Sequence, residues 1–205
     1  MNNDRSQNIK LRSSIDMGSN SVLLLIGKIE GEGLSEIVDQ SRVTSLGKDL
    51  DLNKVFIQES MDKTYQALSD YKKIIEKHEL KTSDTIITAT EASRVAKNAK
   101  EFFNKIQNEL GFNIKLISSE GEAFYTGKGI SLGESETKEK IIIDLGGAST
   151  ELIKISLNPF TIVCSISLPF GSVRAQDWIE KNTLNQNIKD ILSKNDLSNY
   201  LHSRP

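Results

Sequence analysis

The chain has 205 residues, a length between one large domain and two small ones. Its 26 basic and 28 acidic residues give a net charge of −2, so no global positive field recruits a polyanion such as nucleic acid. The single cysteine, Cys164, excludes an internal disulfide and a zinc site built from cysteines. Residues 1–10 lack the apolar stretch of a secretory signal, and the longest apolar run, Val22–Ile26, is far shorter than a membrane span. We therefore expect a cytoplasmic protein that contacts neither a membrane nor nucleic acid.

The first part of the chain has the pattern of a mixed α/β domain. Apolar residues recur at three- and four-residue steps from Met61 to Ile75, which predicts one helix over residues 57–78. Two further helices are predicted over residues 91–97 and 99–110, with Gly111 as a helix stop. Strands are predicted at residues 11–15, 22–26, 36–45, 84–90 and 112–117.

The next helix is predicted to begin near Ser119, with Glu120 and Glu122 in its first turn, where negative charge suits the helix dipole. Glycines at positions 127, 129 and 133 then favour a loop or linker at the start of a second domain. We expect domains at residues 1–125 and 126–205. In the second domain, strands are predicted at residues 140–143, 151–155 and 161–168, and helices at residues 173–181 and 188–201.

One short motif occurs twice. Ile15–Ser21 and Ile143–Ser149 both read Ile-Asp-x-Gly-x-x-Ser, and each lies between two predicted strands. A single Asp-x-Gly is more typical of an ordinary hairpin turn, but two copies with matched flanks indicate two domains that begin in the same way.

An acidic residue at the end of a strand followed by a glycine-rich turn is one way to hold a phosphate. Glycine lets backbone N–H groups approach an anion closely and adopts positive φ, and nearby hydroxyls add hydrogen bonds. The aspartates, Asp16 and Asp144, supply hard oxygen ligands for Mg²⁺, which bridges to phosphate. The candidate phosphate-binding residues in these turns are Gly18, Ser19, Asn20, Ser21, Gly146, Gly147, Ala148 and Ser149.

The sequence resembles the exopolyphosphatase/guanosine pentaphosphate phosphohydrolase family of the actin-like ATPase superfamily. Five ordered segments carry the resemblance: residues 16–21 (DMGSNS), 89–98 (ATEASRVAKN), 117–123 (ISSEGEA), 144–151 (DLGGASTE) and 167–174 (SLPFGSVR). It implies an α/β fold of the actin-like (ribonuclease H-like) type, with duplicated mixed sheets flanked by helices. Because nothing after residue 174 resembles the rest of that family's second domain, we expect the second copy to be truncated.

The resemblance also implies roles for individual residues. Glu122 matches the general base that activates water, Asp144 and Glu151 match positions that handle metal and phosphate, and Arg94 matches a phosphate-contacting arginine. Without the resemblance, Glu122 would be an ordinary first-turn glutamate, Glu151 an exposed strand residue and Arg94 a solvated helix cation. Arg174 is a weaker candidate.

The expected activity is release of terminal orthophosphate from inorganic polyphosphate or guanosine pentaphosphate, with Mg²⁺ as cofactor. Guanosine tetraphosphate is a further expected ligand, and dimers are common in the family, so a homodimer is compatible with the resemblance. Three residues depart from the family pattern, namely Leu23, Gly121 and Ala148. They and the shortened second domain leave open a catalytically impaired relative that binds phosphate or nucleotide as a regulator. An actin-like kinase that uses ATP is a third alternative.

Overall fold

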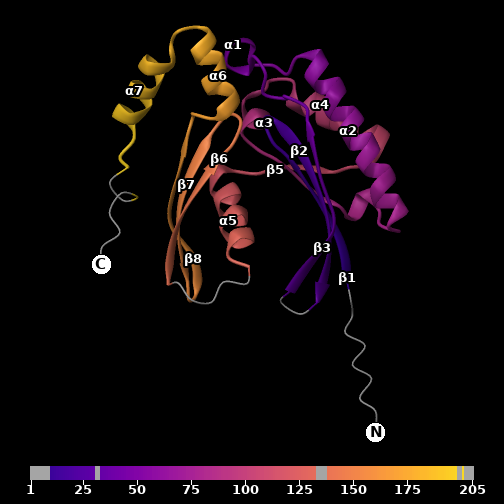
Figure 1. Cartoon of the computed structure of the whole chain (residues 1–205). Coiled ribbons are helices and arrows are strands. Elements are labelled where there is room, and N and C mark those ends of the chain that lie inside the picture. The colour runs from indigo at the N-terminus through magenta and orange to yellow at the C-terminus, as the bar shows by residue number, and fades with distance from the viewer. Residues whose placement is uncertain (1–9, 31–32, 133–137, 198–199, 201–205) are drawn as a thin grey trace. The chain divides into compact units, whose positions relative to one another are not determined.

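The chain divides into two compact units, Met1–Leu116 and Ile117–Pro205, in a computed structural model that describes residues 10–30, 33–132, 138–197 and 200 (Figure 1). The boundary precedes helix α5 (Ser119–Ile130), whereas the sequence placed it at residues 125/126, inside that helix. Gly127 and Gly129 therefore lie in a helix and not in a linker. Gly133 lies outside the described residues.

The first unit contains a five-stranded mixed sheet in the order β3-β2-β1-β4-β5. Its antiparallel strands are β1 (Lys10–Met17), β2 (Ser21–Glu30) and β3 (Gly33–Val43). β4 (Ile86–Ala89) runs parallel to β1, and β5 (Ile114–Leu116) runs parallel to β4. All five strands predicted for this part of the chain are confirmed.

Two helices pack on one face of this sheet, α2 (Gln58–Lys77) and α4 (Ala99–Leu110), and Figure 1 shows them beside the strands. The core beneath them includes Ile15, which lies opposite both Leu24 and Ile87 in neighbouring strands. Gly111 ends α4 in the left-handed region, at φ 80°, as predicted. The shorter elements of this unit are α1 (Leu50–Asn53), the 3₁₀ turn η1 (Thr82–Asp84) and α3 (Glu91–Val95).

The second unit contains three antiparallel strands in the order β6 (Glu139–Leu145), β7 (Thr150–Leu157) and β8 (Phe160–Leu168). Helix α5 packs on β7 and β8 of this sheet. The approach is close at Gly127, where a Cβ would lie 3.2 Å from Ile155 and 3.3 Å from Ile162. Two helices follow β8, α6 (Ser172–Glu180) and α7 (Leu184–Lys194). The last helix was predicted over residues 188–201, but α7 begins earlier and ends at Lys194, and residues 198, 199 and 201 of that range lie outside the described residues. No helix in the described part of the chain has the length and apolar character needed to cross a bilayer.

The buried hydroxyl of Tyr71 links α2 to the sheet. It donates to the Val22 carbonyl oxygen at 2.9 Å, and the Tyr71 side chain is fully buried. Burial raises the pKa of Tyr71, so the hydroxyl keeps its proton and remains a donor.

We predict that Tyr71→Phe lowers the free energy of unfolding by about 1–2 kcal/mol, because the buried Val22 carbonyl loses its donor. Tyr65→Phe, on the same helix, is the matched control, since the Tyr65 hydroxyl contacts Glu109 on the exposed surface. Urea denaturation of both variants measures the difference. Equal stability of the two variants would contradict a structural role for the Tyr71 hydroxyl.

Candidate functional site

The first copy of the repeated motif forms the turn between β1 and β2. The Gly18 N–H donates to the Ser21 carbonyl at 3.0 Å, and a Cβ on Gly18 would lie only 3.2 Å from that oxygen. Asp16 is exposed at the end of β1 and pairs in register with Leu23. Residues Gly18 to Ser21 therefore form the connection between the two strands, and their role in phosphate binding stays a prediction.

A segment after β3 folds over this turn. The N–H groups of Thr44 and Ser45 both donate to the Asn20 carbonyl at 2.9 Å, and the Gly47 N–H donates to the Ser19 carbonyl at 2.7 Å. Three backbone donors from a distant part of the chain thus occupy two carbonyls of the turn and fix its shape.

The second copy, between β6 and β7, folds in the same way. The Gly146 N–H donates to the Ser149 carbonyl at 2.9 Å. After β8, the N–H of Ser172 donates to the Gly146 carbonyl at 2.9 Å, and that of Val173 donates to the Gly147 carbonyl at 2.9 Å. Both turns are consequently closed by the residues that follow the third strand of their own sheet.

Gly171 and Arg174 support the second turn, although the sequence marked Arg174 only as a weaker candidate and assigned no role to Gly171. A Cβ on Gly171 would lie 2.5 Å from both the Ala148 nitrogen and the Gly147 oxygen, so only glycine fits there. Arg174 is 9% exposed, and its guanidinium donates to the Ala148 carbonyl. Both residues lie in segment 167–174, which matches the family pattern. A match in sequence does not show that this segment contacts the turn.

The two acidic residues of the second unit lie opposite each other. Asp144 on β6 pairs in register with Glu151 on β7, which pairs with Ser167 on β8. Residues directly opposite on antiparallel strands project from the same face, so the three polar side chains form a row. Glu151 is 3% exposed and accepts from the Ser167 hydroxyl at 2.7 Å, so its alternative interpretation as an exposed strand residue is wrong.

Two opposed carboxylates fit a divalent cation. Like charges directly across a sheet repel each other, and a hard cation relieves that repulsion through oxygen ligands. Among the described residues no group of three or more His, Cys, Asp and Glu side chains is close enough to hold a metal alone. Mg²⁺ is commonly bound by one or two carboxylates together with substrate phosphates, which matches the pair Asp144 and Glu151. The third predicted metal ligand, Asp16, lies in the first unit.

Glu122 lies on α5, which begins as predicted. Ser118 caps the helix, because its hydroxyl accepts from the Gly121 N–H at 3.2 Å, and the Glu122 N–H donates to the Ser118 carbonyl at 2.9 Å. One turn later, the Thr126 hydroxyl donates to Asp144 Oδ2 at 3.3 Å. Since residues four apart share a helix face, Glu122 lies on the face of α5 that meets Asp144.

Arg94 lies in α3, which follows β4. The last residue of β4, Ala89, is opposite Met17, so Arg94 and the first turn lie at the same end of the sheet. The Arg94 side chain is 19% exposed and pairs with Glu91 at 3.2 Å. Its alternative interpretation as a solvated helix cation is therefore wrong.

The comparisons with known proteins decide the family. The model of the Ppx/GppA phosphatase family matches residues 25–202. The chain belongs to this family.

Individual relatives agree with this assignment. The chain is 34% identical over 199 residues to a bifunctional 3-dehydroquinate synthase/phosphatase of Fusobacterium nucleatum, covering 94% of this chain and 29% of that protein. It is 34% identical over 139 residues to a guanosine-5'-triphosphate,3'-diphosphate pyrophosphatase of Pseudoalteromonas translucida, covering 68% of this chain and 28% of that protein. The chain thus spans about three tenths of the length of these curated relatives.

Solved structures share the fold. A Ppx/GppA family member from Aquifex aeolicus matches with a TM-score of 0.70 and 31% identity, covering 89% of this chain and 59% of that one. An exopolyphosphatase from Cytophaga hutchinsonii matches with a TM-score of 0.77 and 23% identity, covering 89% and 61%. The expected actin-like α/β fold is therefore confirmed.

Two of the three departures from the Ppx/GppA pattern, Gly121 and Ala148, are compatible with the observed backbone, and nothing in the structure explains Leu23. Gly121 lies in the first turn of α5, which begins at Ser119. Among the described glycines only Gly111 has positive φ, and Ala148 does not have it either, so the backbone of the second turn does not require glycine at position 148. Gly18, Gly146 and Gly171 instead matter because they have no Cβ, since a Cβ at any of these positions would lie very close to backbone atoms of the turns.

We predict that Gly171→Ala lowers the free energy of unfolding by about 1–3 kcal/mol, because the new methyl group overlaps the backbone of the second turn. Gly129→Ala is the control. Nothing lies within 4 Å of a Cβ at Gly129, and alanine is the better helix former, so this variant should gain about 0.5–1 kcal/mol. Thermal unfolding followed by circular dichroism measures both, and a Gly171→Ala protein as stable as the parent would refute the close contact.

Proposed function

We propose that this chain is a phosphoanhydride hydrolase that releases terminal orthophosphate from inorganic polyphosphate or guanosine pentaphosphate, with Glu122 as general base. The observation that carries the proposal is the position of Glu122, one helical turn before the Thr126 hydroxyl that contacts Asp144. A carboxylate thus lies on the helix face that meets Asp144, whose pairing with Glu151 suits a phosphate-bound cation. The names of two relatives, an exopolyphosphatase and a guanosine-5'-triphosphate,3'-diphosphate pyrophosphatase, support this choice of substrates.

The proposed reaction needs little from the protein beyond positioning and charge stabilisation. A water oxygen bonds to the terminal phosphorus while the bond from that phosphorus to the bridging oxygen breaks. The water proton passes to the Glu122 carboxylate, and the bridging oxygen leaves with the electron pair.

Each turn would hold phosphate through backbone amides and hydroxyls, namely Gly18 to Ser21 within the first unit and Gly146 to Ser149 within the second. Arg94 supplies a guanidinium suited to phosphate oxygens. Asp144 and Glu151 of the second unit would hold Mg²⁺, which supplies charge neutralisation on the phosphates when bound, and Asp16 remains a candidate metal ligand within the first unit.

A second candidate function is binding without turnover, as a regulator that responds to phosphate or nucleotide. The residue that favours it is Ala148 in the second turn, which departs from the glycine of the family pattern. Binding of polyphosphate without orthophosphate release would support this alternative over hydrolysis.

We predict that Glu122→Gln lowers the rate of orthophosphate release from polyphosphate by about 10²–10⁴-fold, because the amide does not accept the water proton. Glu120→Gln is the matched control, since Glu120 lies in the same first turn of α5. A phosphate-release assay on the folded proteins measures both variants. If the parent and Glu122→Gln proteins release orthophosphate at equal rates, hydrolysis by this mechanism is excluded.

The acidic pair gives a second prediction. Asp144→Asn should raise the Mg²⁺ concentration needed for half-maximal orthophosphate release by more than about tenfold, since one of two hard anionic ligands is lost. A chelator should abolish release by the parent chain. Asp190→Asn, on the exposed side of α7, should leave the Mg²⁺ dependence unchanged. An unaltered Mg²⁺ requirement in Asp144→Asn would remove Asp144 from the metal site.

A further inference from the structure

A pocket of about 420 Å³ lies in the first unit, between one side of α4 and the edge strand β5. None of the predicted phosphate-binding, metal-binding or catalytic residues lines it. We refer to it as the α4–β5 pocket. Its lining residues divide by chemistry into a basic end and a carboxamide end.

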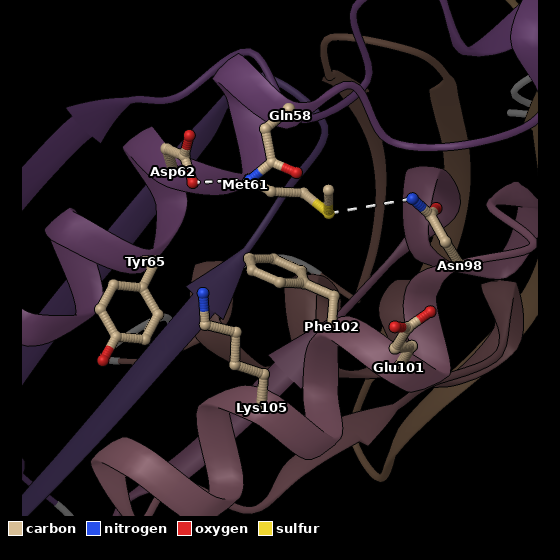
Figure 2. A pocket seen from close by; sticks show the side chains of 8 residues that line it. All are labelled: Gln58, Met61, Asp62, Tyr65, Asn98, Glu101, Phe102 and Lys105. Carbon is tan, nitrogen blue, oxygen red and sulfur yellow. Dashed lines mark hydrogen bonds between the residues drawn. The ribbon is translucent and has the colours of Figure 1, made fainter.

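The basic end lies at the start of α4. Lys97 and Lys100 line the pocket, no acidic side chain does, and neither lysine forms an ion pair within the described part of the chain. Glu101 faces a different pocket between α2 and α4, which Figure 2 shows together with Lys105. The α4–β5 pocket therefore has two positive charges that no lining residue neutralises.

The N-terminus of α4 adds to this positive end. Asn98 is the N-cap residue, but its side chain does not cap the helix. It donates instead to the Phe56 carbonyl at 3.0 Å and accepts from the Phe56 N–H at 2.8 Å. The first-turn N–H groups of this 12-residue helix are thus left without a side-chain acceptor, and their partial positive charge favours an anion.

Ser93 supplies an independent sign of a missing ligand. It lines the same pocket, is 3% exposed, and its hydroxyl has no hydrogen-bond partner among the described residues. A buried hydroxyl without a partner is unfavourable, and a ligand in the adjoining pocket can satisfy it.

The other end of the pocket suits a planar polar ring. Phe103 is half-buried and offers an aromatic surface, and the carboxamides of Asn104, Gln107 and Asn113 also line the wall. None of these three makes a side-chain hydrogen bond within the part of the chain that the structure describes. Carboxamides both donate and accept, which matches the edge of a nucleobase, while the ring can stack on its face.

We propose that the α4–β5 pocket binds a nucleoside phosphate. The phosphate lies against Lys97, Lys100 and the start of α4, and the base lies against Phe103 and the carboxamides. This site is separate from the two turns and does not depend on the proposed hydrolase activity.

The test is binding of GMP and AMP to the full chain by calorimetry, with inorganic phosphate and guanosine as partial ligands. The double variant Lys97→Gln/Lys100→Gln should bind the better nucleotide at least about tenfold more weakly than the parent chain. The matched control is Lys105→Gln, on the other side of the same helix (Figure 2), which should bind within about twofold of the parent. All three lysines are exposed, so these substitutions leave the buried core unchanged, and thermal unfolding of the variants checks that they fold.

A second readout locates the ligand. In the parent chain, side-chain amide resonances of Gln107 and Asn113 should shift on addition of the nucleotide and not on addition of inorganic phosphate. Equal nucleotide affinity in the parent and the double variant overturns the proposal, as does the absence of any binding. Inorganic phosphate binding as tightly as the nucleotide overturns the nucleoside part of it.

Discussion

The structure of the candidate site depends on one set of backbone hydrogen bonds, those that join each Asp-x-Gly turn to the segment after the third strand. The turn carbonyls of Asn20 and Ser19 accept from residues 44–47, and those of Gly146 and Gly147 accept from residues 172–174. Without these bonds the turns would be ordinary hairpin ends, free to vary in shape. With them, the turn amides and hydroxyls are held by a sheet and a loop together, which is the preorganisation that a phosphate site needs.

The same constraint explains why the second unit needs Gly171 and Arg174. The loop that closes the turn must approach its backbone so closely that a side chain cannot fit at Gly171. The buried guanidinium of Arg174 then donates to the Ala148 carbonyl, which keeps a polar group of the turn satisfied away from water. Loop, turn and buried arginine form one unit, so a change in any of them reaches the other two.

Much of the fold was predictable because strands and the long helices have clear periodicity and helix stops, as at Gly111. The duplicated motif located both turns. Long-range backbone contacts could not be predicted, because N–H and carbonyl groups carry no residue-specific signal. The burial of Glu151 depends on Ser167 from a neighbouring strand. The prediction of a linker at Gly127 was wrong. Glycine is a poor helix former, but in α5 its small size allows the helix to pack closely on Ile155 and Ile162.

The pairing of Asp16 with Leu23 and of Asp144 with Glu151 makes the two copies of the turn chemically unequal. These pairs occupy the same place in their hairpins, yet one joins an acid to an exposed aliphatic side chain and the other joins two acids. The same backbone turn therefore presents one carboxylate in the first unit and two opposed carboxylates in the second. The two units share a shape without sharing a charge pattern, so they are not interchangeable parts.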